Sequence, residues 1–359
     1  MGQQQKSNSS RGRGTVENPP NRFERLAYLP IIESPEDQER AVNTQYLKDA
    51  SRSLITFNDS PDVGFDASIN PYRGCEHGCI YCYARPYHEY LGFSAGLDFE
   101  TRILVKEDAP ELLRAELSSP KWKPKVVAIS GVTDCYQPIE RKLGLTRRCL
   151  EVLAEFRNPV VIVTKNQLVT RDIDLLRELA SFNAAAVCVS VTTLDAELAR
   201  VMEPRTSTPA NRLEAIKALT AAGVPVRVLA APVIPGLTDH EIPSIIQAAA
   251  KAGAQHAGYV VLRLPHGVGD LFEGWLDEHF PDRKKKVLNR IREMRGGRLN
   301  DPNFGTRMRG EGVFAEQIKS MFALACRRSG MEFGGHELST SAFRRAGGAQ
   351  LRLFETKTV

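Results

Sequence analysis

The sequence predicts an α/β fold in which a parallel sheet forms a partial TIM barrel of six β/α units. Between residues 65 and 265, short apolar, β-branched runs alternate with segments whose apolar residues recur every three or four positions. Stop signals follow the helical segments, as at Gly223-Val224-Pro225 and Gly253. Strands that alternate with helices pair in parallel through right-handed crossovers, so this order indicates a (β/α)6 barrel, three quarters of a complete one.

The first predicted strand is an extended stretch that leads into a cysteine-rich loop. The six strands are expected at Ala67–Tyr72, Val126–Ser130, Val160–Thr164, Ala186–Thr192, Val226–Ala230 and Tyr259–Leu264. The helices between them are expected at Ala109–Leu117, Leu145–Phe156, Ile173–Phe182, Pro209–Ala222 and Asp239–Ala252. In barrels of this kind the chemistry lies at the C-terminal ends of the strands, so the residues that follow each run are the site candidates.

Three segments flank the core at 65–265. Residues 1–22 are rich in Gln, Ser, Gly and Pro and are predicted to form a disordered tail. Residues 23–64 form an N-terminal extension without strong periodicity. Residues 266–359 form a mainly helical C-terminal extension, which we expect to pack across the open side of the partial barrel. Its helical patterns lie at Leu271–Phe280, Lys285–Met294 and Phe314–Arg328.

The net charge is +5, and the positive charge is concentrated in the C-terminal extension, most densely between Arg283 and Arg298. This basic stretch suits either a nucleic-acid contact or one solvated helix face. No apolar run approaches the ~20 residues that cross a bilayer. The first twenty residues lack the apolar core of a signal peptide. We therefore expect a cytoplasmic protein with no membrane segment.

Cys75, Cys79 and Cys82 carry the strongest chemical signal in the chain. Their C-x3-C-x2-C spacing supplies three thiolates, one fewer than an electron-transfer cluster normally takes. A 4Fe–4S cluster held by three cysteines leaves one iron open to a substrate or cofactor. The alternative is zinc, which needs four ligands, with His77 or His88 as the fourth. A disulfide is disfavoured because the count of 7 cysteines is odd and no secretory segment is visible.

This spacing, with Tyr81 directly before the third cysteine, resembles the radical S-adenosylmethionine (SAM) superfamily. The resemblance implies that the open iron chelates the amino and carboxylate groups of SAM. One electron then cleaves SAM to methionine and a 5′-deoxyadenosyl radical. The electron implies a partner reductant such as flavodoxin or ferredoxin. The resemblance covers roughly residues 65–265 and includes the partial barrel.

The resemblance also implies SAM contacts at the strand ends. Thr133 and Asp134 follow the second strand, where many superfamily members carry a Gly-Gly-Glu that receives the methionine amino group. A helix N-cap is an equal reading of these two residues. Lys165, after the third strand, can pair with the methionine carboxylate, and Ser190 lies on the fourth strand. Arg205, in Met-Glu-Pro-Arg-Thr, suits a carboxylate.

The fifth strand leads into the sequence Pro-Val-Ile-Pro-Gly-Leu-Thr-Asp at residues 232–239. This is close to the G-x-I-x-G-x-x-E pattern that contacts the adenine of SAM, with Pro in place of the first Gly and Asp in place of Glu. Ile234 and Gly236 keep their places in the pattern. They imply an apolar wall and a close approach of the backbone.

Three further short motifs resemble those of the spore photoproduct lyase-like branch, often labelled DNA repair photolyase. They are Asn-Pro-Tyr-Arg-Gly-Cys at 70–75, Thr-Asp-x-Tyr-Gln-Pro-Ile-Glu at 133–140 and Glu-Pro-Arg at 203–205. The lyase of this branch uses a cysteine just before its Ser/Thr-Asp pair to return hydrogen to the repaired thymine. Here the nearest thiol, Cys135, follows the aspartate. Cys135 is either a relocated hydrogen-atom donor or a packing residue.

Two functional hypotheses follow. The first is a radical SAM enzyme whose radical abstracts hydrogen from an unidentified substrate, a nucleic-acid lesion among the candidates. The second is a non-catalytic metal-binding module that binds nucleic acid through the basic C-terminal segment. The sequence indicates neither the substrate nor the oligomeric state.

Overall fold

The computed structural model describes residues 12–15, 17–23 and 43–345. Its centre is an 8-stranded sheet with the order β11-β10-β9-β8-β7-β6-β3-β2. Six of these strands follow one another in chain order and pair in parallel, which confirms the predicted (β/α)6 arrangement. They are β3 (Ala67–Ile69), β6 (Val127–Ile129), β7 (Val160–Thr164), β8 (Ala185–Ser190), β9 (Val226–Val233) and β10 (His256–Val261).

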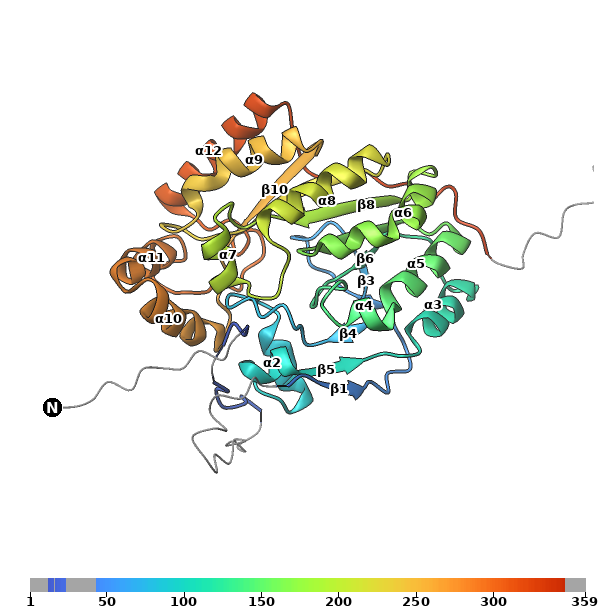
Figure 1. Cartoon of the computed structure of the whole chain (residues 1–359), viewed down its shortest axis with the longest axis horizontal. Coiled ribbons are helices and arrows are strands. Elements are labelled where there is room, and N and C mark those ends of the chain that lie inside the picture. The colour runs from blue at the N-terminus through green and yellow to red at the C-terminus, as the bar shows by residue number, and fades with distance from the viewer. Residues whose placement is uncertain (1–11, 16, 24–42, 346–359) are drawn as a thin grey trace, which may run out of the picture.

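The outer face of this sheet is covered by five helices, which Figure 1 shows as an arc from α3 to α9. Alternation along β7 explains the two faces: Val160 and Ile162 are buried in the main core, whereas Val161 and Val163 are half-buried on the opposite side. The helices are α3 (Ala109–Ser118), α5 (Leu145–Phe156), α6 (Ile173–Ala180), α8 (Pro209–Ala221) and α9 (Ile242–Lys251).

Short elements occupy the connections between the larger ones, where too few residues are present to show a period in the sequence. They are α2 (Leu97–Thr101), α4 (Glu140–Leu143), α7 (Ala196–Met202) and three 3₁₀ helices, η1 (Arg85–Leu91), η2 (Gln167–Asp172) and η3 (Asp239–Glu241). A capping side chain explains where α7 begins, because the Asp195 carboxylate accepts from the backbone N–H of Glu197 and Leu198.

Two differences from the predicted strands concern the first and last ones. The extended stretch at 67–72 is divided: β3 ends at Ile69, and β4 (Tyr72–Arg73) joins β5 (Arg102–Val105) and β1 (Gln45–Lys48) in a separate 3-stranded sheet. The last strand begins earlier than expected and ends at Val261. Both edges of the large sheet gain two-residue strands, β2 (Thr56–Phe57), antiparallel to β3, and β11 (Glu332–Phe333), parallel to β10.

The C-terminal extension is helical as predicted, with α10 (Val268–His279), α11 (Pro281–Glu293) and α12 (Gly312–Ser329). A non-helical strap between α11 and α12 lies beside β10, where the Val261 N–H donates to Met308 O at 2.9 Å. From this strap Arg307 forms an ion pair with Asp62 and donates to Ser60 Oγ at 2.5 Å. The two extensions therefore contact each other across segments far apart in the chain.

The predicted tail at 1–22 needs a correction. Residues 1–11 and 16 lie outside the described residues, but the rest of the segment contacts α2 and η1. Thr15 is buried, and Asn18 donates to Asp98 Oδ1 at 3.0 Å. Polar composition suggested disorder, yet the carboxylates of α2 supply specific partners for these polar groups, which composition alone does not reveal. Along the described part of the chain, every helix falls short of the length and apolar character that crossing a bilayer demands.

Candidate active site

Cys75, Cys79 and Cys82 are free thiols in the loop that follows β4. Cys75 and Cys79 are buried and Cys82 is half-buried. Burial raises the pKa of Cys75 and of Cys79, and the charges of neighbouring thiols add to the effect, while a backbone hydrogen bond from Asp134 to Cys75 opposes it. Three thiolates this close together need a compensating cation. A metal cluster supplies one, so the donor set fits a 4Fe–4S cluster.

His77 and His88, the two alternatives for the fourth ligand of a zinc site, each contact other side chains. His77 lies between Asn166 Nδ2 (3.1 Å from Nε2) and Asp134 Oδ2 (3.4 Å from Nδ1), and burial lowers its pKa to about 4. His88 packs against the rings of Phe93 and Phe99. Within the described ranges, no three His, Cys, Asp or Glu side chains converge as ligands of one ion. Three cysteines in one loop supply one thiolate fewer than the four protein ligands of a structural zinc site, whereas they suffice for a four-iron cluster with one open iron.

The cysteine loop is held by a buried arginine that sequence reasoning missed. The fully buried Arg85 guanidinium donates to Cys79 O at 2.9 and 3.1 Å and to Glu100 Oε1 at 2.6 Å. The other Glu100 oxygen accepts from Gly14 N at 2.9 Å, which places the N-terminal segment against the loop. Gly78 has a φ of +67°, and a Cβ there would lie 2.8 Å from Glu100 Oε2, so only glycine fits.

The Thr-Asp-x-Tyr-Gln-Pro-Ile-Glu motif forms hydrogen bonds that hold the same loop in place. Gln137, fully buried, accepts from the Glu76 N–H at 2.9 Å and donates to Gly74 O at 3.3 Å. Glu140 accepts from the Tyr72 hydroxyl at 2.5 Å. The motif was recognised in the sequence, but no role was predicted for Gln137 or Glu140. Polar residues at fixed offsets from an essential loop are the signal that could have found them.

The structure places Thr133 and Asp134 beside the cysteine loop. Asp134 Oδ1 accepts from Thr164 Oγ1 at 2.8 Å, and Oδ2 accepts from Lys165 N at 2.7 Å. Thr133 Oγ1 donates to Tyr72 O at 3.3 Å. The Asp134 carboxylate thus joins the ends of β6 and β7, and both of its oxygens have protein partners.

Tyr81 meets a buried network formed by the Glu-Pro-Arg segment. Its hydroxyl donates to Glu203, whose carboxylate also accepts from Thr192 Oγ1 at 2.7 Å and pairs with the fully buried Arg212. Burial raises the pKa of Glu203, and the Arg212 charge opposes the rise. The Lys165 ammonium lies 5.8 Å from the centre of the Tyr81 ring. The glutamate of this segment, which sequence reasoning passed over, is the residue that contacts Tyr81.

Arg205 lies on the other side of the cysteine loop. Its N–H donates to His77 O at 3.2 Å, and its guanidinium is 3.4 Å from Glu76 Oε1. Ser190 is buried at the end of β8, where its carbonyl accepts from Arg212 Nη1 at 3.1 Å. Thus Arg205 braces the loop from outside while Ser190 lies near the Tyr81 network.

Ile234 and Gly236, the two residues predicted to contact adenine, lie in different surroundings. Ile234 is fully buried in one hydrophobic cluster with Cys79, Ile80 and Tyr81, so the structure brings it to the cysteine loop. Gly236 has a φ of +85°, a conformation that favours glycine. A Cβ on Gly236 would lie 3.4 Å from Arg290 of α11, so this glycine faces the C-terminal extension.

Cys135 lies in the main hydrophobic core of the barrel. Its side chain is fully buried in the main core, and burial raises its pKa well above the usual range. This burial favours the packing alternative for Cys135.

Beside Cys82, an aromatic ring and an arginine lie near the end of β10. The half-exposed Tyr83 donates to Gly131 O at 2.6 Å, and the Arg263 guanidinium lies 5.7 Å from the centre of its ring. Arg263 also contacts Met308 Sδ at 3.7 Å, and burial lowers its pKa. These residues join the first and last units of the barrel where the site meets solvent.

The chain is similar to known proteins of one superfamily. A family model described as the radical SAM superfamily matches residues 69–249. An uncharacterized protein of Mycobacterium tuberculosis is 38% identical over 248 residues, which cover 68% of this chain and 72% of that protein. An uncharacterized protein of Methanocaldococcus jannaschii is 31% identical over 173 residues, which cover 48% of this chain and 62% of that protein.

Among solved structures, a spore photoproduct lyase mutant with bound AdoMet and dinucleoside spore photoproduct superposes with a TM-score of 0.61. The match covers 88% of both chains at 14% sequence identity. A second mutant of the same lyase gives a TM-score of 0.60 at 15% identity and covers 86% of this chain and 87% of its own. At such identities the likeness shows a shared fold.

Proposed function

Because this chain belongs to the radical SAM superfamily and is therefore an enzyme, we propose that Cys75, Cys79 and Cys82 hold a 4Fe–4S cluster and that SAM binds beside it. The observation that carries this proposal is the set of three free, interacting thiols in one loop, placed at the C-terminal ends of the parallel strands. When bound, the cluster and SAM supply a one-electron cleavage that yields methionine and a 5′-deoxyadenosyl radical.

The surrounding residues prepare the space for this chemistry. The Lys165 ammonium is suited to pair with the carboxylate of SAM, because it lies over the Tyr81 ring next to the third cysteine. Thr133, which follows β6, and Ser190, at the end of β8, offer hydroxyl groups on either side of the end of β7. Asp134, whose oxygens are already bonded, is a positioning residue that keeps the ends of β6 and β7 together.

Other residues shield the site. Ile234 provides an apolar wall against the cluster loop and suits the adenine of SAM, whereas the left-handed turn at Gly236 directs the chain to α11. Arg205 holds the outer side of the loop through Glu76. Arg85, whose charge is balanced by Glu100, holds the Cys79 carbonyl and so fixes the course of the cysteine loop.

We propose that the substrate enters beside Tyr83 and Arg263. An aromatic ring next to a guanidinium suits a substrate that carries both an unsaturated ring and an anionic group, and a nucleic-acid lesion has this chemistry. The lyase with the same fold was solved with a dinucleoside photoproduct, which supports this substrate class. Because Cys135 is buried, the proposed function does not use this thiol to return hydrogen to the substrate.

The test is anaerobic incubation of the iron-loaded protein with SAM and dithionite. We expect 5′-deoxyadenosine and methionine as products, and we expect Cys79→Ala to lose both iron and cleavage. Wild-type protein that holds four irons and four sulfides yet leaves SAM intact would contradict the proposal. Purified protein that contains zinc and no sulfide, with strongly salt-dependent DNA binding, would instead support a non-catalytic module.

A further inference from the structure

The 3₁₀ helix η1 begins just after the third cysteine and exposes its aromatic side chains. Its inward side buries polar groups: Arg85 is fully buried, and His88 and Glu89 are only 1% and 4% exposed. Its outward side carries Tyr87 and Tyr90, which are 53% and 68% exposed. Residues three apart in a 3₁₀ helix lie one above the other, so these two rings share a face. The helix thus reverses the usual arrangement, in which charged groups face water.

Four exposed rings form a row on this surface, which we call the aromatic row: Tyr83, Tyr87, Tyr90 and Phe23. The rings of Phe23 and Tyr90 stack with 4.7 Å between centroids, and those of Tyr90 and Tyr87 lie 6.5 Å apart. Asn21 holds the N-terminal segment here, because its amide donates to two carbonyl groups at and just after η1, both at 2.9 Å. Single exposed rings are ordinary, but a contiguous set marks an interaction surface.

Arginines lie over both ends of the aromatic row. Arg22 is 5.1 Å from the centre of the Phe23 ring, and a carboxylate of η1 neutralises it. Arg263, 5.7 Å from the centre of the Tyr83 ring, forms no ion pair with a carboxylate in the described part of the chain. Tyr87 lies within electrostatic range of the same guanidinium. The row therefore offers ring faces together with one uncompensated positive charge.

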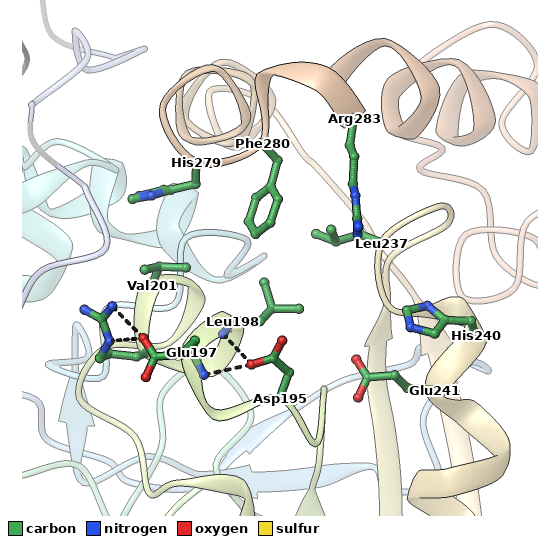
Figure 2. A pocket seen from close by; sticks show the side chains of 11 residues that line it. Asp195, Glu197, Leu198, Val201, Leu237, His240, Glu241, His279, Phe280 and Arg283 are labelled. Atoms are coloured by element: carbon green, nitrogen blue, oxygen red, sulfur yellow. Dashed lines mark hydrogen bonds and ion pairs between the residues drawn. The ribbon is translucent and has the colours of Figure 1, made fainter.

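The cavity between α7, η3 and the junction of α10 with α11 is a contrasting surface (Figure 2). It has a volume of about 550 Å³, and its lining includes the carboxylates of Asp195, Glu197 and Glu241. Of the two arginines that also line it, Arg200 is already paired with Glu197 at 2.8 Å. Carboxylates repel a phosphate backbone, so this cavity does not suit the partner that the aromatic row suits.

We propose that the aromatic row binds a single-stranded nucleic acid, whose bases stack on the rings while the reacting nucleotide enters beside Tyr83. The inference rests on the proposed function, in which the substrate is a nucleic-acid lesion, and it adds the form of the nucleic acid. Every base has a flat face that stacks on an aromatic ring, whatever its hydrogen-bonding pattern. In a duplex, neighbouring base pairs cover these faces, so only a strand with unpaired bases can use the row.

A nucleic-acid strand suits the aromatic row better than a protein partner. The row begins at Tyr83, next to the third cysteine, so its occupant meets the substrate at the entrance of the site. A strand supplies both the substrate and the occupant, whereas a protein seated on the row would cover the entrance. The rings also follow one another in a line without an aliphatic side chain among them, which matches successive bases more closely than the broad apolar core of a protein interface.

The binding test titrates the cluster-loaded protein into a labelled oligonucleotide of ~12 nucleotides, single-stranded or paired with its complement, and measures fluorescence anisotropy. We expect tighter binding of the single strand than of the duplex. DNA and RNA of one sequence are expected to bind similarly, because the ring faces do not read the 2′-hydroxyl. Tyr87→Ala/Tyr90→Ala is expected to weaken single-strand binding at least about tenfold. Its dependence on salt is expected to stay the same, since neither tyrosine neutralises a phosphate.

Two control variants separate stacking from structural effects. Tyr87→Phe/Tyr90→Phe keeps both rings and is expected to bind the single strand like wild type. Phe57→Ala removes a ring that is also exposed and lies 5.5 Å from a lysine ammonium, but it pairs with the first residue of β3, at the end of the strand away from the cysteine loop. This variant is expected to bind like wild type. Each variant is expected to keep its iron and to cleave SAM with dithionite when nucleic acid is absent.

Equal single-strand affinity of wild type and the alanine variant overturns the inference, and so does tighter binding of the duplex. If wild type binds no single strand but forms a dimer in sedimentation that the alanine variant does not form, the row binds a second copy and the inference is wrong. SAM cleavage is measured separately. Protein that binds the strand through the row but leaves SAM intact contradicts the proposed function alone. Protein that cleaves SAM but binds no strand through the row contradicts this inference alone.

Discussion

The hydroxyl of Tyr81 donates a hydrogen bond to the buried carboxylate of Glu203. This contact joins the residue before the third cysteine to the segment that follows α7. Glu203 is also the counter-ion of the fully buried Arg212, so a single carboxylate links the cysteine loop to an ion pair in the interior. Such a pair makes the geometry of the loop sensitive to the loss of either charge.

The substitution Glu203→Gln is expected to lower the free energy of unfolding by about 3–5 kcal/mol, because it leaves Arg212 as an uncompensated buried cation. Urea unfolding of the cluster-free protein measures this loss. The control is Glu197→Gln, which breaks the exposed pair with Arg200 and is expected to change stability by less than about 1 kcal/mol. Equal losses in both variants would contradict the role of burial.

Cysteine substitutions are expected to separate cluster ligands from packing residues. Cys82→Ala removes a proposed ligand and is expected to lose most of the bound iron and sulfide. Cys135→Ala is expected to keep both, since its thiol lies in the main core, and to lower stability by about 1 kcal/mol through the small cavity that remains. Iron and sulfide analysis and thermal unfolding provide the measurements. Loss of the cluster in Cys135→Ala would contradict the placement of this thiol in the main core.

His88 is expected to make the protein less stable in mild acid. Burial lowers its pKa from 6.5 to about 4, although the neighbouring Asp98 charge opposes the shift. Between these two values the unfolded chain binds a proton and the folded protein does not, so stability is full above pH 6.5 and falls as the pH drops toward 4. At pH 5 the loss from this group is about 2 kcal/mol.

The measurement for His88 is urea unfolding at pH 7 and pH 5. In His88→Gln, whose side chain gains no proton, the difference between the two pH values is expected to be about 2 kcal/mol smaller than in wild type. The comparison removes the contribution of carboxylates, because they are the same in both proteins. An identical pH dependence would mean that His88 is protonated in the folded state.

Gly14→Ala is expected to displace the N-terminal segment from the cysteine loop. A Cβ at this position would lie 1.6 Å from Gly78 O, so the backbone must move, and the hydrogen bond to Glu100 is lost with it. We expect faster proteolysis within residues 12–22 and a loss of about 1–3 kcal/mol in stability. Gly64→Ala is the control, since a Cβ added at this position would have no atom within 4 Å. Equal proteolysis of the two variants would contradict the close contact.

Much of the barrel was predictable because its signals are local. The strand at Val160–Thr164 and the helix at Leu145–Phe156 have the predicted bounds, since each shows its own apolar period. The division of the stretch at 67–72 between two sheets was not predictable, because pairing with a distant strand decides it. The order seen in residues 17–22 depends in the same way on α2, which lies far along the chain.

By itself, the sequence determined the cluster-binding chemistry, because this chemistry depends on the spacing of three cysteines. Cys75, Cys79 and Cys82 lie in one short loop, so their proximity survives any arrangement of the rest, and the alternation of strands and helices placed that loop in a barrel. Only the tertiary structure decided that Glu203 contacts Tyr81 and that Cys135 is buried in the main core. These contacts join residues distant in the chain and depend on which face each side chain takes, a choice that a shift of one residue reverses.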